Sequence, residues 1–288
     1  MVDNMISFKT KFYKYQAIGN DYIVIDPNTC ENQLNSKVIK AICDRNYGVG
    51  SDGILYGPLL DEDKTLCLKI YNPDGSEAEK SGNGIRIFAK YLFDNGYISD
   101  DHFSLKTKGG IVHVSRMNKQ ASEIEVDMGM PVFDAKLIPV ANSKGKVIDK
   151  SVEINGTFIK INCVSMGNPH CVVFTDNISK EQACQLGPIL ESHELFPNKT
   201  NVQFVKVIDK NNIQIEIWER GAGYTLASGS SSCAAVSVGI EKRLIQSPVT
   251  VNMPGGNLKI STADNGSILM RGSVNCVAYG YINPEITK

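Results

Sequence analysis

The sequence has almost no excess charge and no long apolar run. Its 288 residues contain 30 lysines and arginines against 31 aspartates and glutamates, a formal net charge of −1. This balance gives no electrostatic reason to expect a nucleic-acid partner. The apolar stretches end well short of the roughly 20 residues that a membrane-spanning helix needs, so we expect no membrane partner. Residues 1–5 lack the apolar core of a signal peptide, and we expect a cytoplasmic protein.

Patterns that bind metals or nucleotides are also missing. None of the eight cysteines forms a C-x-x-C pair and no cysteine–histidine spacing matches a zinc site. We therefore expect no metal, and reduced thiols that behave as small buried hydrophobes. Residues 48–53 match G-x-G-x-x-G, but a helical stretch precedes them and a strand-like segment, 54–56, follows. This order of flanking elements is the reverse of that around a dinucleotide-binding turn. We therefore predict a glycine-rich surface turn instead.

The sequence contains many strand-like segments and few helical ones. Strands are predicted where apolar residues recur in short runs or alternate, for example at 22–25, 66–71, 110–114 and 124–128. Helices are predicted at three stretches of helical spacing, 34–42, 85–92 and 235–243. Many strands with a few separated helices indicate an α+β fold rather than a doubly wound parallel sheet.

The two halves of the chain are alike in plan. Each has strands, then a glycine-rich turn with a Ser-Gly pair, then a helix and further strands. This self-similarity predicts two related domains with a boundary near residue 127. Ser81 and Ser228 each precede an apolar run of helical spacing, so each side chain is predicted to lie at a helix N-terminus.

Turns rich in asparagine and glycine recur along the chain, at 19–21, 72–75, 82–84, 167–169 and 200–201. Each one alone is compatible with a simple turn. Together they supply many amide groups and free backbone N–H donors with little added charge, which suits an amino-acid ligand. His170 follows one of these turns and is the functional candidate among the four histidines.

Six separated motifs, in order, resemble the diaminopimelate epimerase family. They are residues 17–22, 45–53, 72–86, 166–172, 201–202 and 218–233. The resemblance extends over nearly the whole chain. It implies two similar α+β domains, each with strands wrapped around a central helix, and an active site in the interdomain cleft. The last strand returns to the first domain in this family, which implies domains of 1–126 plus 275–288 and of 127–274.

The family inverts an amino-acid Cα by two-base proton transfer, without pyridoxal phosphate or another cofactor. Two cysteines occupy positions 81 and 228 there; one removes the α-proton as a thiolate and the other, as a thiol, protonates the opposite face. The implied activity interconverts LL- and meso-diaminopimelate, in lysine and peptidoglycan precursor synthesis. A homodimer is the assembly that the resemblance suggests.

The resemblance also assigns the other residues of the site, all of which are present. His170 and Glu219 poise the two acid/base groups, and Arg220 grips the distal carboxylate with its planar fork. Together with Glu219 and Arg220, the substrate-binding residues are Gly82, Asn83, Gly229 and Ser230 around the α-carboxylate, and Asn20, Asn72, Asn168 and Asn201.

The chain departs from the family at Ser81 and Ser228, and at Ser231, where the family usually has a small residue. A serine hydroxyl is a far weaker acid than a thiol, whose pKa is about 8.5, and it supplies no useful alkoxide at neutral pH. We therefore expect an inactive Cys-to-Ser form with an intact binding site. Because the binding residues are undamaged, we interpret the paired change as deliberate rather than as drift.

Two alternatives stay open. One is a cofactor-independent racemase of another amino acid, such as histidine, which would share the motifs around Cα and differ in the distal contacts. The other is a non-catalytic amino-acid-binding homologue in which the serines are the natural state. A proline-racemase-type enzyme shares the two-cysteine chemistry, but the motifs at 19–21 and 219–223 argue against it.

Overall fold

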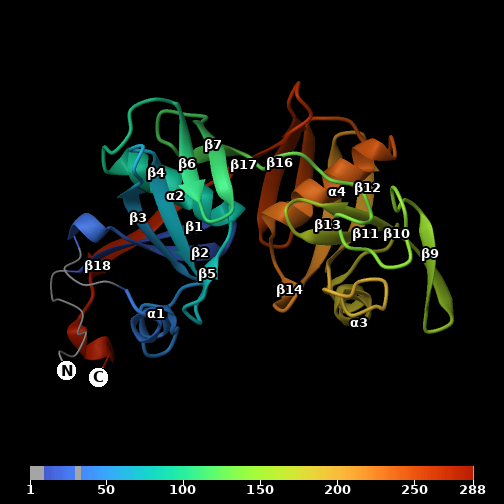
Figure 1. The fold of residues 1–288 in the computed structure, drawn as a ribbon, viewed down its shortest axis with the longest axis horizontal. Coiled ribbons are helices and arrows are strands. Elements are labelled where there is room, and N and C mark those ends of the chain that lie inside the picture. The colour runs from blue at the N-terminus through green and yellow to red at the C-terminus, as the bar shows by residue number, and fades with distance from the viewer. Residues whose placement is uncertain (1–9, 30–33, 288) are drawn as a thin grey trace. The chain divides into compact units, whose positions relative to one another are not determined.

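The computed structural model describes residues 10–29 and 34–287 (Figure 1). The chain divides into two compact units. Unit 1 comprises Met1–Val126 and Gly272–Lys288, and unit 2 comprises Asp127–Arg271. Each unit has its own strands, its own hydrophobic interior and its own long helix among the strands, so each is described separately.

Unit 1 begins with the hairpin β1 (Lys11–Ala17) and β2 (Asn20–Ile25), and α1 (Ser36–Cys43) then crosses to β3 (Ile54–Leu60). β3 pairs parallel to β2 and antiparallel to β4 (Leu66–Tyr71). The remaining elements are β5 (Glu77–Ala78), α2 (Gly82–Asp94), β6 (His102–Thr107), β7 (Gly110–Arg116), β8 (Glu123–Asp127) and β18 (Asn275–Tyr281), with short 3-10 helices at Pro27–Thr29 and Pro284–Thr287.

Unit 2 repeats this order of pairings. The hairpin β10 (Thr157–Ser165) and β11 (Pro169–Phe174) leads through α3 (Lys180–Glu191) to β12 (Asn201–Asp209), which pairs parallel to β11 and antiparallel to β13 (Asn212–Glu219). The other elements are β9 (Lys150–Ile154), β14 (Gly223–Thr225), α4 (Gly229–Glu241), β15 (Val249–Met253), β16 (Gly256–Thr262) and β17 (Ile268–Ser273). The expectation of an α+β chain made of two similar domains is confirmed.

A central helix packs against the strands of each unit. α2 contacts β1, β2 and β3, and α4 contacts β10 to β13, β15 and β16. Both are buried along most of their length, and α4 consists largely of glycine, serine, alanine and valine. Small side chains let strands approach a helix from several directions, and a helix apolar on all sides is typical of a buried one. These two helices carry the serines of interest at their N-termini.

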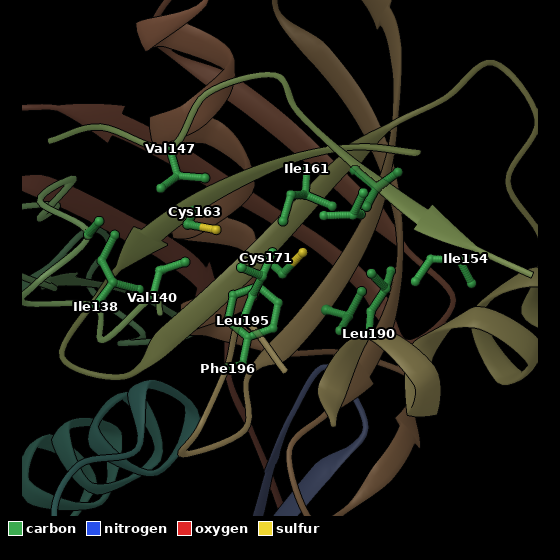
Figure 2. Packing of buried hydrophobic residues seen from close by; sticks show 14 of the residues in the cluster. Ile138, Val140, Val147, Ile154, Ile161, Cys163, Cys171, Leu190, Leu195 and Phe196 are labelled. Carbon is green, nitrogen blue, oxygen red and sulfur yellow. The ribbon is translucent and has the colours of Figure 1, made fainter. Parts of the chain in front are cut away.

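The third helix, α3, was not expected from the sequence. Gly187 and Pro188 lie within it, and both residue types disfavour a helix interior. Packing overrides this preference, because a Cβ at Gly187 would lie 2.5 Å from Cγ of Trp218. The interior of unit 2 includes Leu190 of α3, together with Leu195 and Phe196 from the segment after it, and the last two lie near Cys171 (Figure 2).

The cysteines agree with part of the expectation made for them. The seven that fall in the described residues are free, and four of these are buried: Cys43, Cys163, Cys171 and Cys233. Cys184 and Cys276 are exposed instead, and Cys30 lies outside the described residues. Over the same described ranges, no helix has the length and apolar character needed to cross a membrane. Residues 48–53 lie between α1 and β3, which confirms the reversed order of elements predicted around this turn. The turn is not a surface feature throughout, because Gly50, Ser51 and Gly53 are buried.

Candidate active site

Ser81 is the N-cap of α2, as predicted. Its backbone is extended, and its Oγ accepts a hydrogen bond from the backbone N–H of Gly84 at 3.0 Å. A Cβ at Gly84 would lie 3.2 Å from Oγ of Ser81 and 3.1 Å from Leu55, so glycine keeps this first helical turn open. The first-turn N–H groups of a helix have no partner within the helix, and they favour negative charge at the capping position.

Three further side chains gather around Ser81 in unit 1. The hydroxyl of Tyr22 lies 3.2 Å from Oγ of Ser81. Asn83, on the first turn of α2, donates from Nδ2 to Oδ1 of Asn20 at 3.1 Å. The sequence had marked Asn20, Asn83 and Ser81 as site residues, and the structure brings them together with Tyr22. We call Tyr22, Ser81, Asn20 and Asn83 the unit-1 cluster.

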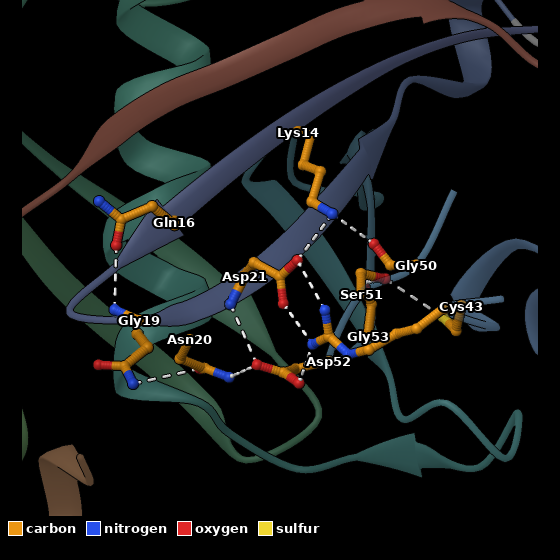
Figure 3. A network of polar contacts seen from close by, with 12 residues as sticks. Lys14, Gln16, Gly19, Asn20, Asp21, Cys43, Gly50, Ser51, Asp52 and Gly53 are labelled. Carbon is orange, nitrogen blue, oxygen red and sulfur yellow. Dashed lines mark hydrogen bonds and ion pairs between the residues drawn. The ribbon is translucent and has the colours of Figure 1, made fainter. Parts of the chain in front are cut away.

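Charged residues hold Asn20 from the other side (Figure 3). Asn20 donates from Nδ2 to Oδ2 of Asp52 at 2.7 Å, and Nη2 of Arg45 lies 2.6 Å from the second oxygen of Asp52. Arg45 and Lys14 also pair with Asp21, at 2.7 Å and 2.9 Å. Burial disfavours the charge on Asp21, but hydrogen bonds from Arg45 and Lys14 outweigh it and hold the pKa of that carboxyl below its usual value.

Asn72 occupies the exposed turn after β4. Its Nδ2 donates to Oγ of Ser76 at 2.9 Å, within its own turn. The structure therefore gives Asn72 a local partner, whereas Asn20 and Asn83 bond to each other. Its proposed role toward a substrate rests on the motif alone.

Ser228 is the N-cap of α4 and occupies the place in unit 2 that Ser81 has in unit 1. It is 5% exposed, and its Oγ accepts from the backbone N–H of Ser231 at 3.5 Å. Gly229 is the first residue of the helix, and a Cβ there would lie 2.7 Å from Sδ of Met270. Ser230 is the second residue of the same turn. Gly82 holds the corresponding first position of α2.

Glu219, the last residue of β13, lies beside Ser228. Burial raises the pKa of the Glu219 carboxyl above its usual value, and a hydrogen bond with the Ser228 hydroxyl partly opposes this shift. A carboxyl in this state carries or releases a proton more readily near neutral pH than an exposed one does. The pairing of Glu219 with Ser228 is thus the counterpart of the pairing of Tyr22 with Ser81.

His170 is fully buried in unit 2. Its Nε2 lies 2.9 Å from Oδ1 of Asn168, two residues earlier in the chain. Burial lowers the pKa of the imidazole to about 3, and although Gln203 opposes this shift, the charge of Arg220 adds to it. His170 is therefore neutral at neutral pH, and it can orient Asn168 but cannot supply a positive charge.

Asn201 ties this region to the turn after β13. It lies opposite His170 in the parallel pairing of β11 with β12. Its Nδ2 donates to the carbonyl of Pro169 at 2.9 Å, and its Oδ1 accepts from the backbone N–H of Arg220 at 3.0 Å. We call the gathered residues of unit 2 the unit-2 cluster; they are Ser228, Glu219, His170, Asn168, Asn201 and Arg220.

Arg220 is exposed, and Glu191 anchors the turn that carries it. Nη1 of Arg220 donates to the carbonyl of Asn198 at 3.2 Å. The Glu191 carboxylate accepts from the backbone N–H of Gly221 at 3.1 Å and from Nε1 of Trp218 at 2.8 Å. Burial opposes the charge on Glu191, but these bonds and Lys199 keep the pKa of its carboxyl below the usual value. The guanidinium is therefore carried on a fixed turn with its charge available to a ligand.

The sequence interpretation missed Tyr22, Asp52 and Glu191. Tyr22 and Asp52 lay inside motifs already quoted, at 17–22 and 45–53, and a polar residue within such a motif was the signal available. No local pattern marks Glu191, because its partners follow 27 and 30 residues later in the chain. In the described part of the chain, no group of three or more histidine, cysteine, aspartate or glutamate side chains is arranged to hold a metal ion.

The chain matches a known protein family. The family model for diaminopimelate epimerase matches residues 12–133 and 162–277. A protein of Nostoc sp. named "Diaminopimelate epimerase 2" is 49% identical over 276 residues, which are 96% of each chain. The diaminopimelate epimerase of Moorella thermoacetica is 36% identical over 265 residues, covering 88% of this chain and 92% of that one.

Solved structures share the fold at much lower identity. A probable proline racemase from Agrobacterium radiobacter aligns with a TM-score of 0.68 at 12% identity, covering 95% of this chain and 93% of that one. A phenazine biosynthesis protein of the PhzF family from Bacillus anthracis aligns with a TM-score of 0.65 at 15% identity, covering 95% and 99%. The fold is therefore shared with racemases and related proteins, while the sequence matches are narrower, and they show that the chain belongs to the diaminopimelate epimerase family.

Proposed function

We propose that this chain is the scaffold of an epimerase that interconverts LL- and meso-diaminopimelate, with Ser81 and Ser228 at its two acid/base positions. The observation that carries the proposal is the equivalence of these serines. Each caps the central helix of its unit, and each is hydrogen-bonded to one titratable side chain, Tyr22 or Glu219. The family match supports the reaction and its place in lysine and peptidoglycan precursor synthesis.

Inversion at one carbon explains why two such positions are needed. One group removes the α-proton and the other delivers a proton to the opposite face, so both clusters have to act on one substrate molecule. The helix N-termini at Gly82 and Gly229 offer backbone N–H groups that suit the α-carboxylate. Arg220 suits the distal carboxylate, and the side chains of Asn20 and Asn201 suit the ammonium groups. Nothing in this scheme calls on pyridoxal phosphate.

Turnover by this chain is proposed to be very low or absent. A thiol beside a helix N-terminus ionises readily, whereas a serine hydroxyl at the same place does not. Proton transfer by one positioned acid or base accelerates a reaction by a factor of roughly 10²–10⁴. This chain has a serine hydroxyl in place of the thiol at both positions. The binding residues remain, so substrate binding is expected to survive.

The test is restoration of both thiols. We expect the Ser81→Cys/Ser228→Cys variant to take up deuterium at Cα of LL-diaminopimelate in heavy water and to form the meso isomer, while the starting chain does neither. The matched control is Ser99→Cys/Ser151→Cys, which adds one exposed thiol to each unit and should stay inactive. No exchange with diaminopimelate in the restored variant would overturn the proposal.

The same variant separates the alternatives. Exchange at Cα of another amino acid, such as histidine, would identify a racemase with different distal contacts. Stoichiometric binding of an amino acid without exchange, in both the starting and the restored protein, would identify a binding homologue.

Assembly and location complete the proposal. A homodimer is supported by β18, which pairs with β1 and exposes two large aromatic side chains, Tyr279 (72% exposed) and Tyr281 (68%). Burying such side chains against a second copy would be favourable. Sedimentation of the purified chain measures its oligomeric state directly. The seven cysteines within the described residues are free, which suits a reducing compartment and supports the cytoplasm.

A further inference from the structure

We infer that Tyr22 is the positioning residue for the acid/base group at position 81. Its phenol hydroxyl is placed to donate a hydrogen bond to whichever atom, oxygen or sulfur, ends the side chain there. The inference rests on the proposed function for its meaning in catalysis, but the contact itself can be tested without substrate. Tyr22 lies in the motif at residues 17–22, from which the sequence predicted a role for Asn20 but none for Tyr22.

The phenol ring is held firmly. Tyr22 is 8% exposed and lies in the middle of β2, which pairs with β1 on one side and with β3 on the other. Its ring edge packs on Gly53, where a Cβ would lie 2.7 Å from Cε1 of the ring. The same Cβ would lie 2.4 Å from the carbonyl oxygen of Tyr71, so a side chain at position 53 would force the backbone or the ring to shift. The glycine leaves room for the Tyr22 ring, whose hydroxyl lies 3.2 Å from Oγ of Ser81.

Two donors converge on the end of side chain 81. The backbone N–H of Gly84 lies 3.0 Å from Oγ and can only donate. When the group at position 81 is an anion, the hydroxyl of Tyr22 also donates to it, because a phenol keeps its proton at neutral pH. Two hydrogen bonds to the charged form favour that form over the neutral one. A thiol at position 81 is therefore expected to ionise more readily with Tyr22 present than without it.

The unit-2 cluster differs from the unit-1 cluster in the partner of its serine, which can carry a negative charge. Ser228 is paired with a carboxyl, Glu219, which accepts from a neutral hydroxyl or thiol and repels an anion when it is ionised. Tyr22 can donate to an anion at position 81, whereas Glu219 can do so at position 228 only while its carboxyl carries a proton.

The first experiment measures the ionisation of a thiol at position 81 directly. The Ser81→Cys variant is alkylated with iodoacetamide from pH 6 to pH 10, and mass spectrometry follows the peptide that contains residue 81, so the native cysteines do not interfere. Adding Tyr22→Phe keeps the ring and removes the hydroxyl. We expect the apparent pKa of the thiol to rise by about one unit, a roughly tenfold loss of thiolate near neutral pH.

A matched control removes a different buried phenol from the same unit. The hydroxyl of Tyr15 donates to Asp94 at the opposite end of α2, at 3.0 Å, so Tyr15→Phe should leave the alkylation profile of residue 81 unchanged. An identical profile with and without Tyr22→Phe, in proteins with the same melting temperature, would overturn the inference. Because no substrate is present, this outcome is independent of whether the chain is a diaminopimelate epimerase.

A second arm uses the Ser81→Cys/Ser228→Cys enzyme. If it is active, Tyr22→Phe should shift the acidic limb of the pH profile of kcat/KM to higher pH by about one unit. KM for diaminopimelate should stay nearly unchanged. A purely structural role would instead alter KM or thermal stability at every pH. An unshifted limb together with an unshifted alkylation profile would leave Tyr22 with a packing role alone.

Discussion

Asn20 and Asp52 form a 2.7 Å hydrogen bond in which the carboxylate of Asp52 also receives Arg45 at 2.6 Å. The bond settles the orientation of the Asn20 amide, because Nδ2 has to face Asp52 and Oδ1 then faces Nδ2 of Asn83. An amide side chain is nearly symmetric in shape, so its partners decide which end a ligand meets. The ion pair behind Asn20 therefore controls what the unit-1 cluster offers to a substrate.

Replacing Asp52, which orients Asn20, should weaken substrate binding without unfolding the protein. We expect Asp52→Ala to raise the Kd for meso-diaminopimelate about tenfold, because one charge-assisted hydrogen bond that orients the amide is lost. Titration calorimetry on the present chain measures this at equilibrium, since an inactive protein does not convert the ligand. Asp101→Ala is the control, because it removes another exposed ion pair, with Arg116, and should leave Kd unchanged. Equal Kd values for all three proteins would contradict the anchoring role.

Arg220 should discriminate between ligands by their distal ends. We expect Arg220→Lys to weaken meso-diaminopimelate at least about tenfold, because an ammonium cannot reproduce the bidentate fork of a guanidinium. Binding of L-lysine, which lacks the distal carboxylate, should stay as it was. Calorimetric titration of both ligands gives the comparison, with Arg243→Lys as an exposed control on the same unit. A parallel loss for both ligands would assign Arg220 to the α-carboxylate or to structure instead.

The buried imidazole of His170 should make folding depend on pH. Its pKa of about 3 in the folded protein lies below the usual value of about 6.5, so between these pH values the unfolded chain binds the extra proton. The free energy of unfolding should therefore fall as the pH falls below about 6.5. Relative to His170→Gln, which cannot titrate, the loss between pH 7 and pH 5 should be about 2 kcal/mol.

Urea unfolding at both pH values measures this difference for His170. His102→Gln is the control, since His102 is exposed on β6 and should behave like the starting chain at both pH values. If His170→Gln shows the same pH dependence as the starting chain, the imidazole is not neutral in the folded protein.

The parts of the site that could be predicted are those that depend on neighbours in the chain. Ser81 and Ser228 precede glycine and an apolar run, which is enough to predict an N-cap, and both are N-caps. The α+β class and the likeness of the two halves also follow from local patterns. α3 was missed because Gly187 and Pro188 oppose a helix locally. Burial of Ala183 and Leu190 and the contact of Gly187 with Trp218, which is distant in the sequence, favour it.

The order of the amino acids establishes which chemical groups the site can offer: two hydroxyls in place of two thiols, several amides, one guanidinium and a family pattern that implies their use. The tertiary structure sets the protonation state of those groups and the partners to which they are hydrogen-bonded. Burial lowers the pKa of His170 and raises that of Glu219, and the packing of α2 against β2 brings Tyr22 to Ser81, 59 residues later in the chain. The reason is physical: ionisation and hydrogen bonding depend on solvent exposure and on distances between residues that the order of amino acids does not contain.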